Sequence, residues 1–299
     1  MKCYNCKYHP TNFLFYSICY ITGDKFKISK CNNCYTISPS PQPKNLNKFY
    51  PENYRKYKYF VKYLLNIKYF LFVYSINKVF KKKIKKILEI GCGDGTMLKI
   101  FKKMNWIVHG IERNNILQNK SLNIYSKTIS SYRSRSFDLI LMYNSLEHIR
   151  KPFNFLKNTL NKLKKDGLII ITVPNYLSYQ YKFGQADWLH LDAPRHLNIF
   201  SKKTFYNYFK KNKIIHIQEL SSCAFELELY GWFITIENKF FIEQNKSHKV
   251  IMNFNKSKMS FFLVIVRFAL LLPFTLILSV ISISLNHGST IKIILKKND

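Results

Sequence analysis

Arginine and acidic residues are scarce in this chain of 299 residues. Only 7 of its 48 basic residues are arginine and only 16 residues are acidic, so the formal net charge is +32. Arginine is the side chain suited to bidentate contacts with phosphate and guanine, so its scarcity argues against a nucleic-acid partner. A solvated, lysine-rich surface accounts better for the charge, and attraction to an anionic membrane is the alternative.

A secretory leader is not expected, because the first ten residues, MKCYNCKYHP, are polar and carry cysteines. Hydrophobic residues make up 47% of the chain, which excludes a disordered protein. The length predicts one main domain with small additions. The arrangement of the cysteines fits a reducing compartment, so we expect a cytoplasmic protein.

Four of the seven cysteines form two closely spaced pairs, Cys3 with Cys6 and Cys31 with Cys34. Two pairs of this spacing in a short polar unit predict a zinc ion held by four thiolates. Because four ligands close the site, we expect a structural role. An iron–sulfur site or redox-active pairs are the alternatives.

Strand and helix patterns alternate after residue 86, which predicts an α/β fold with a parallel, doubly wound sheet. The expected strands lie at 86–91, 106–111, 137–143, 167–173, 214–220 and 290–295, and the expected helices at 50–86, 94–104, 153–163 and 202–212. Ser201 is the expected N-cap of the last helix, and Glu147 and His148 are expected to start the helix before it.

The chain divides into five expected units. Residues 1–45 form the zinc-ribbon-like unit, and 46–86 a helical linker that follows a proline-rich exit. Residues 87–223 form the core, 224–288 an apolar helical insertion, and 289–299 the final strand of the core.

A glycine-rich turn ends the first core strand, where Gly91, Gly93 and Gly95 allow a ligand to approach the backbone closely. The following helix directs its N-terminal N–H groups at that ligand. The spacing is GxGxG, and Glu89 precedes the first glycine by two residues. Both features favour S-adenosylmethionine (SAM) over a pyrophosphate-bearing dinucleotide, with Cys92 lying within the turn.

Glu112 ends the second core strand, nineteen residues after Gly93. A carboxylate at that position can accept hydrogen bonds from both ribose hydroxyls of a nucleoside cofactor. A surface acid at a strand end is the alternative.

The segment FDLILMYNSLEH, at 137–148, resembles the stretch after the fourth strand of class I SAM-dependent methyltransferases, and the resemblance extends over about 84–220. It implies a Rossmann-like sheet of seven strands, with Asp138 opening the strand. Tyr143, Asn144 and Leu146 would line the SAM pocket. Residues 123–136 lack the carboxylate with which many relatives contact adenine, which leaves recognition of the adenine ring unassigned.

The segment DWLHLDAPRHLNIF, at 187–200, resembles the acceptor-side segment of the methyltransferase-23-like subgroup of these enzymes. His190 and His196 are candidate general bases. Arg195 is a third candidate, which would hold an anionic acceptor or simply pair with Asp192. The alternative is that these residues only anchor the loop, since methyl transfer depends largely on alignment.

An apolar run at 261–285 is long enough to span a bilayer. A single crossing would separate the last strand from its sheet, so we expect either a helical hairpin bent at Pro273 or helices lying in the membrane interface. A buried cover or a dimer interface is the alternative.

These features together predict a methyltransferase at the cytoplasmic face of the membrane, acting on a small molecule, a sugar or a lipid-linked glycan precursor. A quinone-type O-methyltransferase is the second hypothesis. An RNA methyltransferase, suggested only by the charge, is the third, and a non-catalytic binding module is the fourth.

Overall fold

The computed structural model describes residues 3–7, 11–50, 59–81, 83–114, 117–210, 215–222, 224–240, 244–252 and 258–297. The sequence FYPENYRKY at 49–57 resembles the Y-x-x-x-Y stretch that follows a zinc-ribbon-like unit in some sugar methyltransferases. It lies mostly outside these residues, as does Cys223.

A seven-stranded sheet forms the centre of the molecule, in the order β6-β5-β4-β7-β8-β10-β9. Its first five members run parallel, and β10 is antiparallel to both of its neighbours. The strands are β4 (Lys85–Ile90), β5 (Trp106–Ile111), β6 (Ile124–Tyr125), β7 (Phe137–Tyr143), β8 (Leu163–Pro174), β9 (Ile215–Ser222) and β10 (Thr290–Lys297).

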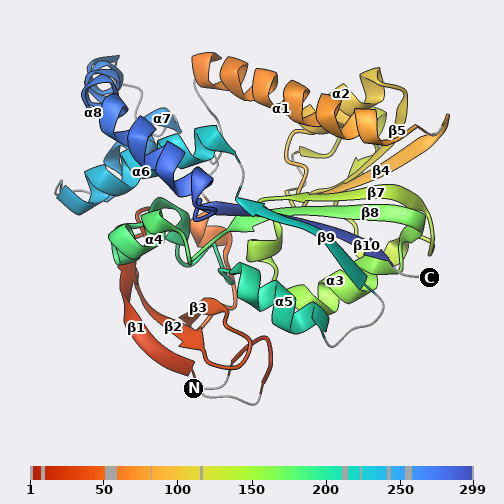
Figure 1. Ribbon diagram of the computed structural model, residues 1–299, viewed down its shortest axis with the longest axis horizontal. Helices are drawn as coiled ribbons and strands as arrows, with labels where there is room; N and C mark the ends of the chain where they lie inside the picture. The colour runs from red at the N-terminus through yellow and green to blue at the C-terminus, as the bar shows by residue number, and fades with distance from the viewer. Residues whose placement is uncertain are drawn as a thin grey trace.

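Helices cover both faces of this sheet (Figure 1). On one face, α1 (Tyr59–Val79) and α2 (Thr96–Lys103) pack through Val73, Leu98 and Phe101. On the other face lie α3 (Pro152–Leu160) and α5 (Lys202–Lys210). The expected doubly wound α/β sheet is therefore confirmed.

The predicted elements agree with the structure except at their ends. Ser201 caps α5, since its Oγ accepts the N–H of Thr204 at 3.3 Å. Glu147 and His148 do not start α3 as predicted. They lie in a separate 3-10 turn, η5 (Leu146–His148), and α3 begins at Pro152, whose fixed φ suits a first helical turn.

The N-terminal unit forms a small antiparallel sheet of β1 (Thr11–Ile18), β2 (Lys25–Cys31) and β3 (Ile37–Ser40). Ile37 also forms a bridge with Ile199 of the core, so this sheet is joined to the acceptor-side segment. Figure 1 shows it beneath α4 (Tyr179–Gly184).

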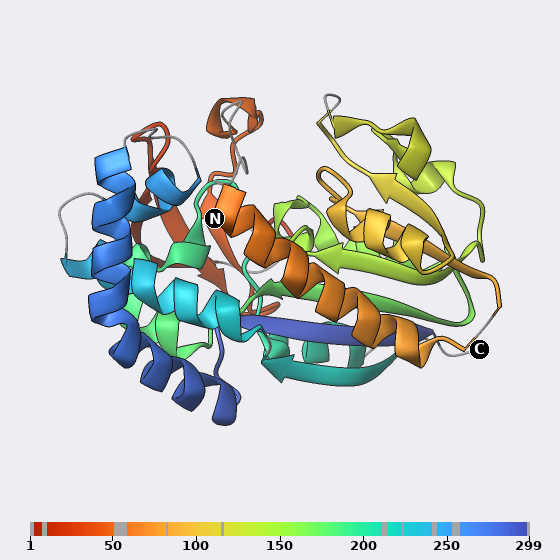
Figure 2. The same ribbon diagram turned by 90° about the horizontal axis from the view of Figure 1, so that it is seen from above.

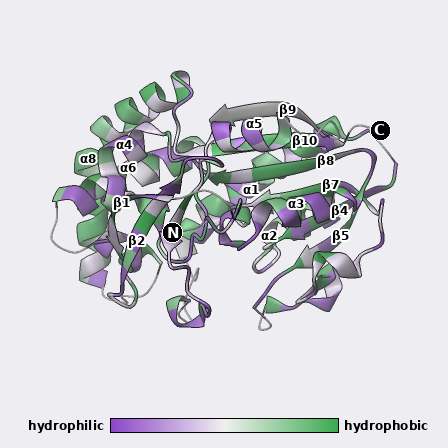
Figure 3. Ribbon diagram, turned by 90° about the horizontal axis from the view of Figure 1, so that it is seen from below, coloured by the Kyte–Doolittle hydropathy of each residue, from purple (hydrophilic) through white to green (hydrophobic). Residues whose placement is uncertain are grey.

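Between β9 and β10 the chain forms α6 (Phe225–Phe240), α7 (Lys246–Ile251) and α8 (Lys258–Ser284). The expected hairpin bent at Pro273 is wrong, because α8 continues through this proline as one helix. A proline kinks a long helix without ending it where packing holds the turns on either side. Figure 3 colours much of α8 as hydrophobic, like the central strands.

Candidate functional site

The glycine-rich turn follows β4 in a conformation that requires glycine. Gly91 has a φ of 75°, and a Cβ there would lie 2.7 Å from the Cβ of Ser145. Gly95 has a φ of 73°, and its Cβ would lie 2.5 Å from Ile124 Cδ1. Gly93, at a φ of 55°, has no heavy atom within 4 Å of its Cβ position. The turn is thus packed tightly on the residues that follow β7 and on β6, and it is open at Gly93.

Glu112 stands beside this opening, directly after β5. Its Oε2 accepts the N–H of Gly93 at 2.8 Å, and its Oε1 accepts the N–H of Asn114 at 3.1 Å. The carboxylate is therefore fixed at the carboxyl edge of two adjacent strands, which is where ligands bind in open α/β sheets.

Three side chains next to the turn carry buried oxygens that have no hydrogen-bond partner in the described part of the chain. They are Glu89 Oε2, Asn144 Oδ1 and Ser145 Oγ. Burial, with Asp94 and Glu112 nearby, raises the pKa of Glu89 well above its usual value. Buried polar groups are normally paired, so these acceptors fit a cationic, hydrogen-bonding ligand such as SAM.

The other predicted cofactor residues take different positions. Cys92 and Leu146 have buried side chains that belong to the hydrophobic clusters on either side of the sheet. Tyr143 lies at the end of β7, with its ring in edge contact with Tyr69 and Phe72 of α1. Cys92 and Leu146 can therefore contact a cofactor mainly through their backbone.

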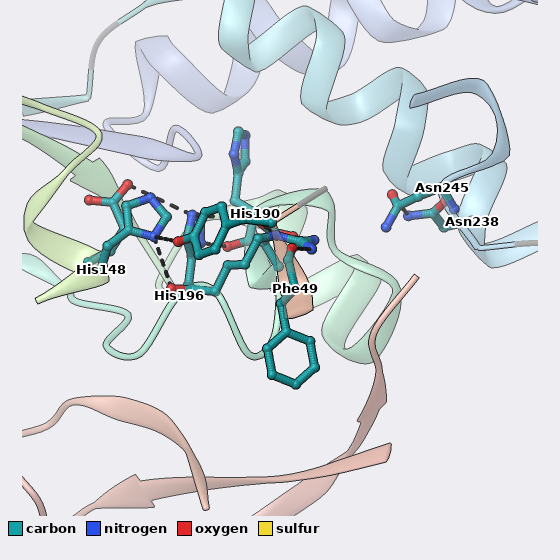
Figure 4. A network of polar contacts seen from close by, with 10 residues as sticks. Phe49, His148, His190, His196, Asn238 and Asn245 are labelled. Atoms are coloured by element: carbon teal, nitrogen blue, oxygen red, sulfur yellow. Dashed lines mark hydrogen bonds and ion pairs between the residues drawn. The ribbon is translucent and has the colours of Figure 1, made fainter. Parts of the chain in front are cut away.

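The acceptor-side loop folds back over η5, so that His196 lies next to His148 (Figure 4). The rings of His148 and His196 are 4.9 Å apart between centroids. The Nε2 atom of His196 is 3.9 Å from Glu147 Oε1. Sequence reasoning missed Glu147 and His148 as site residues, although the L-E-H segment was the available signal.

Arg195 is completely buried and pairs with Asp192, the alternative considered from the sequence. Its Nη1 donates to the carbonyl of Phe49 at 2.9 Å, and its guanidinium stacks over the Tyr20 ring. The arginine holds the pKa of the Asp192 carboxyl well below its usual value despite burial. Arg195 thereby ties the loop to the N-terminal unit.

His190 is separated from the His148–His196 pair and lies against the Trp188 ring, at 5.4 Å between centroids. Burial is the main cause that lowers its pKa to about 3, and His196 adds to the effect. His190 is thus neutral at physiological pH and a weak base.

The four cysteines of the N-terminal unit converge, and all four sulfurs lie within 4.8 Å of one another. The Sγ atoms of Cys3 and Cys34 are 3.5 Å apart, as are the Sγ atoms of Cys6 and Cys31. A tetrahedral zinc ion with bonds of about 2.3 Å places its sulfurs about 3.8 Å apart. The cluster therefore fits zinc with small adjustments.

The N-terminal unit also contacts the acceptor-side loop through hydrogen bonds. Asn5 Nδ2 donates to Asn198 Oδ1 at 2.8 Å, and Gln42 Nε2 donates to the Leu197 carbonyl at 2.8 Å. The position of this loop thus depends on the cysteine-bearing unit.

Comparison with known proteins identifies relatives of this chain. Residues 55–212 match the model of a family described as a methyltransferase domain. One similar protein is a ubiquinone biosynthesis O-methyltransferase of Glaesserella parasuis, 27% identical over 32% of this chain. The match spans 48% of that relative, about half of its length. A ubiquinone biosynthesis O-methyltransferase of Rickettsia typhi is 22% identical over 56% of this chain and 76% of its own.

Solved structures with a similar fold include the plantazolicin methyltransferase BpumL in complex with triazolic desmethylPZN analog and SAH. It is 18% identical, has a TM-score of 0.45, and the match covers 78% of this chain and 84% of its own. A SAM-dependent methyltransferase from Archaeoglobus fulgidus is 17% identical, with a TM-score of 0.44, over 81% of this chain and 100% of its own.

Proposed function

This chain belongs to the methyltransferase domain family, and from that premise we propose that it transfers the methyl group of SAM to a small-molecule, sugar or lipid-linked acceptor. The observation that carries the proposal is the pairing of Glu112 with the open glycine turn, at 2.8 Å from the Gly93 N–H. When bound, SAM supplies an electrophilic methyl group on a sulfonium centre.

The residues beside the turn are assigned to the parts of this cofactor. Glu112 accepts the ribose hydroxyls, as a carboxylate at a strand end can. Glu89 and Asn144, whose buried oxygens need partners, face the ammonium end of the methionine part. The glycine turn (Gly91, Gly93 and Gly95) bounds the ligand, together with the backbone of Cys92 and Leu146 and the ring of Tyr143.

Calorimetric titration of the purified chain with SAM tests this assignment. Glu112→Gln keeps the shape and removes the charge, so we expect SAM affinity to fall about 10- to 100-fold, as for the loss of a charged hydrogen bond. Glu226→Gln is the control, because this acid lies on α6 and pairs with Lys68. Absence of SAM binding by the unaltered chain would overturn the proposal.

For the acceptor, we propose that His196 faces the bound substrate while Arg195 and His190 position the loop that carries it. His196 adjoins Glu147, whereas the guanidinium of Arg195 is occupied by Asp192 and Phe49. His196→Ala should lower turnover at least tenfold with SAM affinity unchanged. Near-full turnover by His196→Ala would exclude a role of His196 at the substrate.

We propose the location of the protein from α8, which buries polar side chains and exposes apolar ones. An ordinary surface helix does the reverse. Its small polar side chains, Thr275, Ser279 and Ser282, are fully buried, whereas Leu270 and Ile277 are 69% and 60% exposed. By length and composition α8 could cross a bilayer, with a mean hydropathy of 2.6 over its most apolar window. An exposed apolar face of this size favours contact with lipid.

Helix α1 also exposes large apolar side chains, among them Leu64, Phe70 and Leu71. Both helices lie along the upper edge of the molecule in Figure 1, and both face the viewer in Figure 2. Because α6 packs between α8 and the loop at 187–189, we propose that α8 lies in the interface of the cytoplasmic leaflet and does not cross it.

A lipid-linked glycan precursor is the acceptor class that agrees best with this location. A quinone-type acceptor is the second candidate, since relatives in Glaesserella and Rickettsia are named for ubiquinone biosynthesis. Turnover of radiolabelled SAM with a polyprenyl-linked sugar and with a prenylated catechol would separate the two. No nucleic-acid acceptor is proposed.

We further propose that residues 1–45 bind zinc as a structural unit, joined by 46–86 to a core of 87–223 and 289–299 that carries the insertion 224–288. The four cysteine sulfurs within 4.8 Å and the separate sheet β1–β3 support this division.

A further inference from the structure

Three side chains able to bind a metal meet between the glycine turn and the acceptor-side loop. They are Glu147 and His148 of η5 and His196 of the loop, and their ligand atoms all lie within 4.8 Å of one another. We propose that they bind one divalent transition-metal ion that holds the oxygen of the acceptor. The role of the ion rests on the proposed methyltransferase function, whereas its binding does not.

The two imidazole rings are held in the orientation that metal binding requires. His148 Nδ1 lies 2.9 Å from the carbonyl oxygen of Arg195, and His196 Nδ1 lies 2.7 Å from that of His190. Because a carbonyl can only accept, each Nδ1 carries a hydrogen, which leaves the Nε2 of each ring as the ligand atom. The Tyr50 hydroxyl also lies 3.1 Å from His148 Nδ1. A backbone carbonyl behind the ring is the usual support of a metal-bound histidine.

Glu147 supplies the negative charge of the ligand set. Its side chain is completely buried, and its Oε1 is 3.9 Å from His196 Nε2. Ligand atoms about 2.1 Å from a tetrahedral ion are about 3.4 Å apart, so this pair needs to approach by about half an ångström, and no pair of the three by more than about 1.4 Å. His196 Nε2 is also 3.9 Å from Asp192 Oδ2, but Arg195 holds that carboxylate.

Two imidazoles and one carboxylate suit a borderline ion such as Zn²⁺ or Co²⁺ and leave a coordination position open. Glu147 is two residues beyond Ser145, which packs against Gly91 of the turn. The open position therefore lies near the cofactor. An acceptor hydroxyl bound there would lose its proton to water more readily, and its oxygen would then form the bond to the methyl group as the sulfonium becomes a thioether.

Cobalt titration of the full-length, metal-stripped chain distinguishes this site from the cysteine cluster. Thiolate-bound Co²⁺ shows intense near-ultraviolet charge-transfer bands, whereas Co²⁺ bound by histidine and carboxylate shows only weak visible bands. We expect two ions per chain, one of each kind. Glu147→Gln should remove only the ion without thiolate bands, and Cys31→Ser should remove only the ion with them.

Uptake of the thiolate-bound ion alone would overturn the proposal, as would an unchanged second ion in both Glu147→Gln and His148→Gln. His148→Gln keeps the proposal testable if Glu147→Gln fails to fold, because the His148 side chain is only half-buried. SAM titration of the same samples separates the two proposals. A chain that binds the second cobalt without binding SAM retains the metal site and refutes the methyltransferase assignment.

Discussion

Arg267, in the middle of the apolar helix α8, donates through its Nε to Glu237 of α6 at 2.6 Å. Its Nη2 also donates to Ser247 of α7 at 2.9 Å. The one charge within the apolar run therefore points inward, to a paired position, and does not interrupt the exposed face. This pairing explains how a basic residue can occur in a helix whose opposite face suits lipid.

The exposed face of α8 should be required for membrane binding. Leu270→Glu with Ile277→Glu places two charges on that face, and we expect sedimentation with vesicles of one-third anionic lipid to fall at least tenfold. Both residues are exposed, so the fold and SAM affinity should be retained. The control is Ile107→Glu, at an exposed position of β5 away from the helix. Equal sedimentation of all three proteins would exclude lipid contact through α8.

The turn after β4 should tolerate no side chain at Gly91. Gly91→Ala places a Cβ 2.7 Å from that of Ser145 at a φ of 75°, and the strain should cost about 1–3 kcal/mol of stability. We expect SAM affinity to fall at least tenfold by calorimetry. Gly23→Ala is the matched control, because Gly23 has a φ of 74° with nothing within 4 Å of its Cβ position. Similar SAM affinities of the two variants would contradict a steric requirement.

The sheet was predictable because its signal is local. The run at 137–143 is apolar at nearly every position, and the structure places Phe137, Leu139, Ile140 and Leu141 at 0% exposure in β7. Such a run, bounded by a polar segment and alternating with helical patterns, is typical of a strand buried on both faces. The spacing of the three glycines likewise predicted the turn after β4. The positive φ values of this turn are a local property, because glycine adopts them without steric cost.

The cluster at the acceptor side was not predictable, because its members come from separate segments. Glu147 and His196 are 49 residues apart in sequence and meet only when the loop returns over η5. The path of α8 through Pro273 was also missed, because local rules end a helix at proline and do not include the packing of the turns around it.

Loss of the cysteine cluster should disturb the acceptor side more than the cofactor side. Cys31→Ser should remove one zinc ion per chain by atomic emission, because it removes one of four ligands. The N-terminal unit holds the loop through Gln42 and Asn5, so we expect turnover to fall while SAM affinity stays. Cys19→Ser is the control, a buried cysteine outside the cluster. Unchanged zinc content in Cys31→Ser would exclude the site.

Stability should fall between about pH 6.5 and pH 4 in part because of His248. Burial is the main cause that lowers its pKa to about 4, with Asp192 opposing the shift and Arg195 adding to it. The His248 Nδ1 atom forms a hydrogen bond with the Tyr230 hydroxyl at 2.7 Å, and the imidazole packs edge-on against the Tyr20 ring. In this range the unfolded chain binds a proton that the folded chain does not, so folding weakens as the pH falls, by up to about 1.4 kcal/mol per pH unit.

Urea denaturation of the wild type and His248→Gln, at pH 7.5 and at pH 5, isolates this contribution. At pH 7.5 the histidine is neutral in both states, so the difference between the proteins reports packing alone. At pH 5 the wild type should have lost about 1–2 kcal/mol more than the variant, because glutamine does not titrate. Equal losses in both proteins would mean that His248 takes up its proton without unfolding, and that its burial between Tyr20 and Tyr230 does not oppose the charge.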